Sequence, residues 1–177
     1  MIETERLTLR PFTLADAARV QLLAGEREIA ATTLSIPHPY EDGVAEGWIS
    51  AQKERIERGE LACFAIVTKE DNVLIGSIGL TIQAWARRAE LGYWIGKPYW
   101  GRGYGTEAAM AIISYGFGRL DLNRIYACHF ARNPASGRVM QKIGMKYEGC
   151  RRQHVVKWGG YEDIVDYGML RSDYDAR

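Results

Sequence analysis

Apolar and polar residues alternate along much of the chain, which is the pattern of half-buried β-strands. The first example is at residues 6–10, where Leu7 and Leu9 alternate with polar residues and Pro11 ends the strand. Other segments are rich in β-branched and aromatic residues and are bounded by polar turns or by glycine. The strands predicted in this way are residues 6–10, 61–68, 73–82, 89–95, 124–131, 154–158 and 161–170, the last two joined by a tight turn at Gly159-Gly160.

Apolar residues spaced three or four apart predict four helices between these strands. Thr13 can cap the first helix with Asp16 as its capping-box partner, and the apolar stripe of this helix reaches Leu22. The second helix, residues 44–58, ends at Gly59 and has a charged, solvated outer face. The other two helices are residues 104–117 and 134–143. Strands and helices mixed in this order predict an α/β (α+β) fold.

Composition narrows the class of protein. A chain of 177 residues fits one ordinary domain, so we expect a single domain over residues 1–177. The net charge is +1 with acids and bases interspersed, which argues against direct nucleic-acid binding. No secretion signal and no apolar run of about 20 residues is found, so we expect a cytoplasmic protein with no membrane contact. The three cysteines and three histidines are scattered and predict neither a disulfide framework nor a metal site.

A glycine-rich segment lies between the strand at 89–95 and the helix that follows it. Gly101, Gly103 and Gly105 alternate with larger residues, so the backbone can curl tightly and expose several N–H groups in one concave nest. The next helix begins near Thr106, and the N-terminus of a helix carries partial positive charge. Arg102 adds a full positive charge. The segment therefore predicts a binding site for a phosphate or pyrophosphate.

Two other nucleotide-binding motifs do not fit the spacing of this loop. A dinucleotide-binding turn requires Gly-x-Gly-x-x-Gly, but the sixth position from Gly101 is Thr106 and the sixth from Gly103 is Ala108. A nucleotide-triphosphatase loop requires Gly-Lys-Ser/Thr, and no lysine follows Gly105. A plain glycine-rich connection without a ligand remains the alternative.

The loop resembles the acyl-coenzyme A (acyl-CoA) signature Arg/Gln-x-x-Gly-x-Gly/Ala of the GNAT superfamily of N-acetyltransferases, with Gly103 and Gly105 on its glycine positions. Trp100 replaces the usual Arg or Gln, as is typical of the RimJ/RimL-type ribosomal-protein acetyltransferase branch. Residues 133–145 resemble the family motif Asn-x-x-Ser/Ala…Lys-x-Gly-Phe, with Met145 in place of Phe. The last predicted hairpin is similar to that of RimJ/RimL-type members, and the order of elements resembles the family fold over residues 6–170.

The resemblance implies a GNAT fold with a mixed sheet of about seven strands and about four helices, in which strands 4 and 5 splay apart to form the acyl-CoA site. It implies transfer of an acetyl group from acetyl-CoA to a primary amine by direct attack, without a metal. The expected acceptor is a protein N-terminal α-amine, of the ribosomal-protein alanine type. Alternatives are a small amine (polyamine, amino acid or antibiotic) or a catalytically idle module that only binds acyl-CoA. Either a monomer or a homodimer is compatible with the sequence.

The resemblance also implies a set of residues that contact CoA. Trp94 and Ile95 would offer backbone groups to the pantetheine arm and the thioester. Asn133 would hydrogen-bond the pantetheine arm, although it could equally be a helix cap. The loop residues that would cradle the pyrophosphate are Trp100, Gly101, Arg102, Gly103, Tyr104, Gly105 and Thr106.

Two catalytic roles follow from the same resemblance. Glu90 stands where several family members carry a glutamate that deprotonates the amine through water, although it could instead be an exposed charge at a strand end. An α-amine has a pKa near ~7.7–8.0, so an N-terminal acceptor needs little help to lose its proton. A lysine side chain has a pKa near ~10.4 and would depend much more on the base. Many members protonate the thiolate with a tyrosine, but Met140 stands there. Ser136 then becomes the candidate acid. Tyr147 is a further possibility, although as a strand aromatic it is expected in the core.

Overall fold

The computed structural model describes residues 1–177 and is built on one eight-stranded sheet with the strand order β1-β2-β3-β4-β5-β6-β8-β7. Neighbouring strands are antiparallel except for β5 and β6, which are parallel. The sheet is therefore mixed, as predicted, with one strand more than expected. The strands are β1 (Ile2–Glu3), β2 (Leu7–Arg10), β3 (Leu61–Thr68), β4 (Leu74–Gln83), β5 (Arg88–Ile95), β6 (Arg124–Phe130), β7 (Lys146–Lys157) and β8 (Gly160–Leu170).

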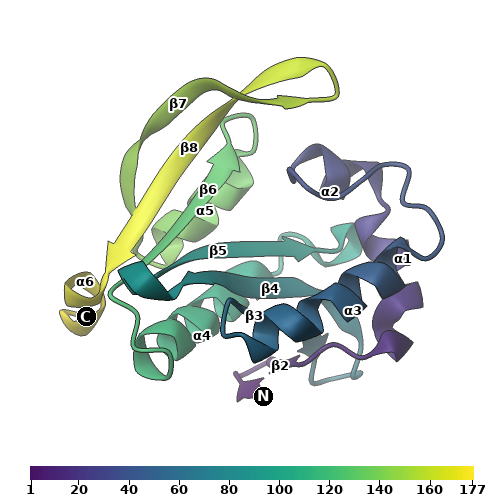
Figure 1. Ribbon diagram of the computed structural model, residues 1–177, viewed down its shortest axis with the longest axis horizontal. Helices are drawn as coiled ribbons and strands as arrows, with labels where there is room; N and C mark the ends of the chain where they lie inside the picture. Colours follow the sequence, from purple (N-terminus) through teal and green to yellow (C-terminus); the bar gives the residue numbers. More distant parts are fainter.

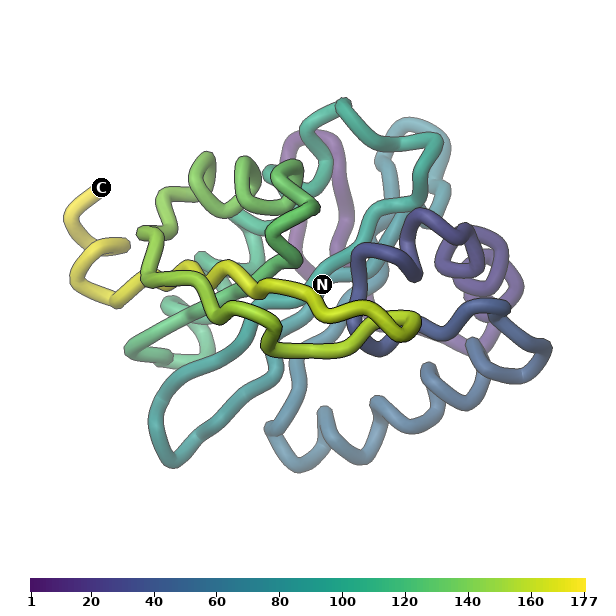
Figure 2. The backbone as a smooth tube through the Cα atoms, turned by 90° about the horizontal axis from the view of Figure 1, so that it is seen from above, coloured from purple at the N-terminus to yellow at the C-terminus, as the bar shows by residue number.

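Helices cover both faces of the sheet (Figures 1 and 2). Alternate residues of β3 show the division, because Phe64 and Ile66 pack in the core with α4, whereas Ala65 and Val67 pack in a second cluster with α1 and α3. None of the helices combines the length and the apolar composition that a bilayer-spanning helix needs. The helices are α1 (Ala17–Ala24), α2 (Arg27–Ala31), α3 (Val44–Glu57), α4 (Tyr104–Gly118), α5 (Pro134–Lys142) and α6 (Arg171–Asp175).

Strands β5 and β6 separate soon after they begin to pair. Their parallel ladder holds only three residue pairs, the last of which joins Glu90 to Tyr126. From Leu91 to Ile95 the edge of β5 that faces β6 has no strand partner. This divergence confirms the splayed pair implied by the family resemblance. It is visible between β5 and β6 in Figure 1.

The β7–β8 hairpin arches over this opening toward α2 (Figure 1). At its tip Lys157 Nζ donates to the Leu34 carbonyl at 3.4 Å, and the Trp158 ring lies 6.0 Å from the His38 ring. Trp158 and Gly159 both have positive φ, of 51° and 80°. The predicted tight turn is therefore present, but it is centred one residue earlier than Gly159-Gly160.

Four of these elements differ from the sequence prediction. Strand β7 begins at Lys146, whereas the sequence predicted a start at residue 154. The earlier residues were missed because most side chains of β7 are exposed, so its sequence lacks the alternation of a half-buried strand. The helices α2 and α6 were not predicted, since each has only five residues. Helix α1 begins at Ala17, after a 3₁₀ turn at Leu14–Asp16. The predicted capping box caps this 3₁₀ turn rather than α1 itself, and in it the Asp16 carboxylate accepts the Thr13 N–H at 2.8 Å.

Replacing Asp16 by asparagine is expected to lower the free energy of unfolding by about 2–3 kcal/mol at neutral pH. The buried Asp16 carboxylate accepts two hydrogen bonds from Arg10, at 2.7 and 2.9 Å, besides the one from Thr13. The Arg10 guanidinium holds the pKa of Asp16 below its ordinary value. A depressed folded-state pKa stabilises the protein above the unfolded-state pKa of about 3.9, and this stabilisation is lost as pH falls through the folded value.

Urea unfolding of wild type and Asp16→Asn at neutral and at strongly acidic pH measures this effect. The difference between the two proteins should shrink in acid. Asp121→Asn is the matched control, because Asp121 also pairs with arginine but its side chain is 77% exposed, so less than about 1 kcal/mol should be lost. Equal losses for both variants at neutral pH would contradict the prediction.

Candidate functional site

The divergence of β5 and β6 opens into a cavity of about 1130 Å³ that is lined from both faces of the sheet. Every residue singled out from the sequence for binding or catalysis lines it, except Arg102 and the alternative acid Tyr147. The lining residues among them are Glu90, Trp94, Ile95, Trp100, Gly101, Gly103, Tyr104, Gly105, Thr106, Asn133 and Ser136.

The glycine loop has the curled backbone that its sequence predicts. Gly101 and Gly103 have φ values of +74° and +82°, in the left-handed region that favours glycine, and Gly103 is the N-cap residue of α4. Gly105 lies inside α4, where a Cβ atom would sit 3.4 Å from Tyr93 Cε2. Its small size thus lets the first turn of α4 pack against β5. The residues of that turn, whose first N–H groups have no partner within the helix, line the cavity.

Arg6 supports this loop from β2's side of the sheet, a role that no sequence signal indicated. Its guanidinium donates to the Arg102 carbonyl at 3.0 Å and to Glu107 Oε2 at 2.7 Å, and it lies 4.8 Å from the centre of the Tyr104 ring. Burial alone would raise the pKa of Glu107, but hydrogen bonds from Thr4 and Arg6 outweigh it and keep that pKa low. The paired carboxylate therefore leaves the helix N-terminus free for an anion.

Arg102 does not line the cavity, which corrects the prediction for this residue. Its guanidinium is exposed and lies 5.8 Å from the centre of the Tyr99 ring. Gly101 and Gly103 on either side of it, both with left-handed φ values, do line the cavity.

Arg102→Ala is accordingly expected to weaken CoA binding by no more than about fivefold, as for other exposed charge contacts. The loss should shrink further at high salt, because exposed charges are screened. Titration calorimetry with CoA at low and high salt measures both effects. A loss of two orders of magnitude that persists at high salt would place Arg102 in direct contact with the phosphates.

The backbone of β5 divides its hydrogen-bonding groups between β4 and the gap. The Gly96 N–H, just after β5, donates to the carbonyl of Ile75 in β4 at 2.8 Å. A Cβ atom on Gly76 of β4 would lie 2.3 Å from the Trp94 carbonyl oxygen, so the Trp94 backbone faces β4. By alternation the N–H groups of Tyr93 and Ile95 face the gap. The expectation for Trp94 is therefore corrected, since its indole lines the cavity while its backbone pairs within the sheet.

Tyr93 and Ser136 meet across the gap between β5 and α5. The Tyr93 hydroxyl and Ser136 Oγ are 3.1 Å apart. Burial raises the pKa of the Tyr93 phenol, and the hydrogen bond with Ser136 opposes this only in part, so the phenol stays protonated. Tyr93 was not predicted as a functional residue, because nothing local in the sequence indicates that it would reach a helix more than forty residues away.

Asn133 occupies the N-cap position of α5, but its side chain makes no capping hydrogen bond. The alternative of a simple helix cap is therefore not realised. Its amide lines the cavity and is free to bind a ligand.

Glu90 lies at the point where the two strands separate. Its carboxylate is half-buried, lines the cavity and is 3.8 Å from Cys128 Sγ. Gly92 is the next residue on this face of β5, and a Cβ atom added to it would meet no atom within 4 Å, so the floor beside Glu90 is open. Tyr147, the alternative acid, is 61% exposed and packs on Tyr167, outside the cavity. The expectation that Tyr147 lies in the core is therefore wrong.

The charges that line the cavity are mainly positive. The lining contains two acids, Glu90 and Asp166, and four basic residues, Arg55, Arg138, Lys142 and Arg151. Arg151 binds Asp166 through two hydrogen bonds of 2.7 Å. The net charge of the lining therefore favours an anionic ligand. No group of three or more His, Cys, Asp or Glu side chains is placed to hold a metal ion.

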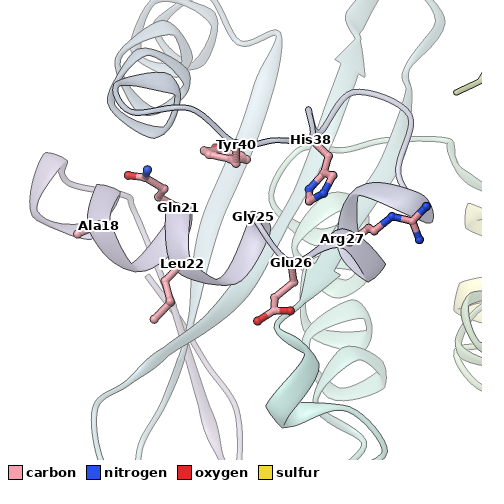
Figure 3. Close-up of a pocket in the computed structure, with 8 residues that line it drawn as sticks. All are labelled: Ala18, Gln21, Leu22, Gly25, Glu26, Arg27, His38 and Tyr40. Carbon is pink, nitrogen blue, oxygen red and sulfur yellow. The ribbon is translucent and has the colours of Figure 1, made fainter.

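A second, more open hollow of about 670 Å³ lies beside α1 (Figure 3). Side chains from α1, from the start of α2 and from residues 37–40 surround it. None of the residues predicted to bind or react lines this hollow. The candidate site is therefore the cavity at the strand gap.

The three cysteines are expected to differ widely in reactivity toward iodoacetamide. Burial raises the pKa of Cys128 to about 11, and the neighbouring Glu90 carboxylate contributes to this rise, while burial also raises the pKa of Cys63 to about 11. Cys150 is exposed. Since the thiolate is the nucleophile, Cys150 should be alkylated first at neutral pH, and Cys128 only as the pH rises toward 11.

Mass spectrometry of peptides from a labelling time course measures these rates. Glu90→Gln should speed the alkylation of Cys128 by removing the nearby negative charge. Labelling of Cys128 at the rate of Cys150 at neutral pH would contradict the environment described for it.

Comparisons with known proteins agree with this geometry. Residues 6–146 match the family model described as acetyltransferase (GNAT) domain. The uncharacterized N-acetyltransferase p20 of Bacillus licheniformis is 32% identical over 173 residues, or 97% of this chain and 96% of that protein. The ribosomal-protein-serine acetyltransferase of Escherichia coli is 31% identical over 115 residues, or 64% of this chain and 63% of that protein. The solved structure of a spermidine N-acetyltransferase from Vibrio cholerae, in complex with CoA and spermine, superposes with a TM-score of 0.83 at 24% identity, covering 97% of this chain and 99% of that one.

Proposed function

Since this chain belongs to the GNAT family of N-acetyltransferases, for which acetyl-CoA is the acetyl donor, we propose that its acceptor is the N-terminal α-amine of a protein or peptide. We further propose that it belongs to the RimJ/RimL-type branch. The observation that carries the proposal is the gap between β5 and β6, with the glycine nest on one side and Glu90 at its apex. The similarity to a ribosomal-protein-serine acetyltransferase supports this acceptor class.

In this proposal the nest and the first turn of α4 hold the pyrophosphate of CoA. The left-handed glycines leave room for phosphate oxygens, because a Cβ at Gly101 would meet no atom within 4 Å. Arg138 and Lys142 of α5 add positive charge to the cavity lining. The Asn133 amide and the N–H groups of Tyr93 and Ile95 then hydrogen-bond the pantetheine arm and the thioester.

The chemistry assigned to the remaining residues is direct acetyl transfer. Glu90 takes a proton from the ammonium group through water, and the neutral amine attacks the thioester carbon. The amine nitrogen bonds to the carbonyl carbon to give a tetrahedral oxyanion, which N–H groups from β5 stabilise. The C–S bond breaks as this oxyanion collapses, and the leaving thiolate takes a proton from the Ser136 hydroxyl, which Tyr93 orients through their 3.1 Å hydrogen bond. The acetylated nitrogen then gives up its surplus proton, which restores the Ser136 hydroxyl.

A small amine such as a polyamine is the second candidate acceptor. Two observations favour it: the solved structure with spermine shares this fold, and Glu90 forms no ion pair that would stop it from meeting a cation. A catalytically idle module remains the alternative from another class.

Release of free CoA from acetyl-CoA, followed with a thiol reagent, separates these candidates. The acceptor panel contains peptides with free N-termini, the same peptides with blocked N-termini, spermidine and single amino acids. We expect release with free peptides alone. Release with spermidine alone would favour the polyamine reaction, and CoA binding without release for any amine would indicate an idle module.

A further inference from the structure

One buried polar side chain in the lining of the cavity has no partner in the protein. Gln52 of α3 is only 6% exposed, and its amide nitrogen Nε2 makes no hydrogen bond. Gln52 is also part of the cavity lining. Leaving a buried amide unpaired costs free energy that an apolar residue of the same size would not. A group that arrives with the acceptor would remove this cost.

The same face of α3 carries an unpaired cation. Trp48, Gln52 and Arg55 are spaced four and three residues apart, so they lie on one face of the helix, and all three line the cavity. Their neighbours Glu54 and Arg58 form an ion pair with each other on the outside of α3, whereas Arg55 belongs to no ion pair. An amide and a guanidinium side by side are suited to bind a carbonyl or carboxylate oxygen.

The floor of the cavity connects this pair to Glu90. Gly79 of β4 and Gly92 of β5 are direct cross-strand partners, so no side chains rise between them. Helix α3 packs over β3, because its Ala45 and Ile49 lie in one cluster with Ala65 and Val67. Strands β3 and β5 are two strand spacings apart, or about 10 Å. The pair on α3 therefore lies about this far across the sheet from the strand that carries Glu90.

On the basis of the proposed function, we infer that Gln52 and Arg55 form a subsite for an oxygen-bearing, anionic group of the acceptor, about 10 Å from the reacting amine. An extended chain spans about 3.3–3.6 Å per residue, so this distance corresponds to the third residue of a peptide. The preferred acceptor is a peptide whose third residue is acidic. A polyamine has no oxygen for Gln52 and would bring positive charge toward Arg55.

Matched tripeptide amides test this subsite, with alanine at the first two positions and either aspartate or lysine at the third. We expect the wild-type enzyme to show a kcat/KM at least about tenfold higher for the aspartate peptide. Arg55→Ala should reduce this preference to within about twofold. Gln52→Met should raise the KM for the aspartate peptide about tenfold with little change in kcat.

The stability of Gln52→Met separates a binding role from a structural one. Because methionine fills similar space without an unpaired amide, this variant should unfold at the same or a higher temperature than wild type. Arg58→Ala is the matched control on the same helix, since Arg58 pairs with Glu54 and does not line the cavity. It should leave the peptide preference unchanged.

Two kinds of failure are distinguishable. If no amine releases CoA from acetyl-CoA, the proposed function fails. If peptides are acetylated but the aspartate and lysine peptides react equally well, or Gln52→Met leaves KM unchanged, the function stands and the subsite is overturned.

Discussion

Glu90→Gln is expected to lower the turnover rate by about 10²–10⁴-fold near neutral pH while leaving the affinity for CoA unchanged. Glutamine keeps the shape of the side chain and can hydrogen-bond, but it cannot accept a proton from the ammonium group. The carboxylate forms no ion pair and contacts Cys128 Sγ only at 3.8 Å, so folding should be little affected. Glu90 also lies away from the glycine nest, at the opposite end of the unpaired segment of β5.

The loss should depend on pH. An α-amine with a pKa near ~7.7–8.0 is already neutral in mildly alkaline solution, where the enzyme no longer has to remove its proton. Glu90→Gln should therefore recover much of the wild-type rate there. With a lysine side-chain amine as acceptor, whose pKa is near ~10.4, recovery should require a much higher pH.

Steady-state rates across the pH range, with CoA affinity measured by calorimetry, decide the role of Glu90. Glu46→Gln on the exposed outer face of α3 is the control for the loss of one carboxylate. A drop of less than about fivefold at every pH would assign deprotonation to solvent, against the usual contribution of a general base.

Gly103→Val is expected to weaken CoA binding by more than about 100-fold, because it disrupts the backbone of the nest itself. Gly103 has a φ of +82°, which costs an L-residue roughly 1–2 kcal/mol and a β-branched residue more. A Cβ there would already lie 3.4 Å from the terminal nitrogen of Arg6, the residue that supports the loop. The two further methyl groups of valine would occupy the space in front of the α4 N-terminus.

Gly43→Val provides a close control. Gly43 is also an N-cap residue with a φ of +84°, at the start of α3, and a Cβ there meets no atom within 4 Å. Both variants should therefore lose similar stability from backbone strain, but only Gly103→Val should lose CoA affinity. Thermal unfolding and calorimetry measure the two quantities. Unchanged CoA affinity in Gly103→Val would show that the pyrophosphate does not bind at this loop.

The sequence predicted the fold well where burial alternates along a strand or along a long helix. It predicted β7 only in part, because exposed side chains on both faces leave no apolar pattern to detect. It placed the glycine nest on the right loop, since left-handed turns and helix starts are local properties of the chain.

The direction of individual side chains was predicted less well. Arg102 was expected to face the ligand, but its side chain is exposed and does not line the cavity. Tyr93 with Ser136, and Arg6 with Glu107, are pairs of residues far apart in the chain, which no local pattern can reveal. The unpaired amide of Gln52 likewise depends on how α3 packs over the sheet.

The unpaired segment of β5 has a consequence for handling the protein. It is a strand edge in the middle of a sheet, with N–H groups that face no partner strand. Such edges recruit strands from other molecules and promote aggregation. An extended ligand in the gap would cover this edge. We therefore expect purified protein to remain soluble longer at high concentration when CoA is present throughout purification and storage.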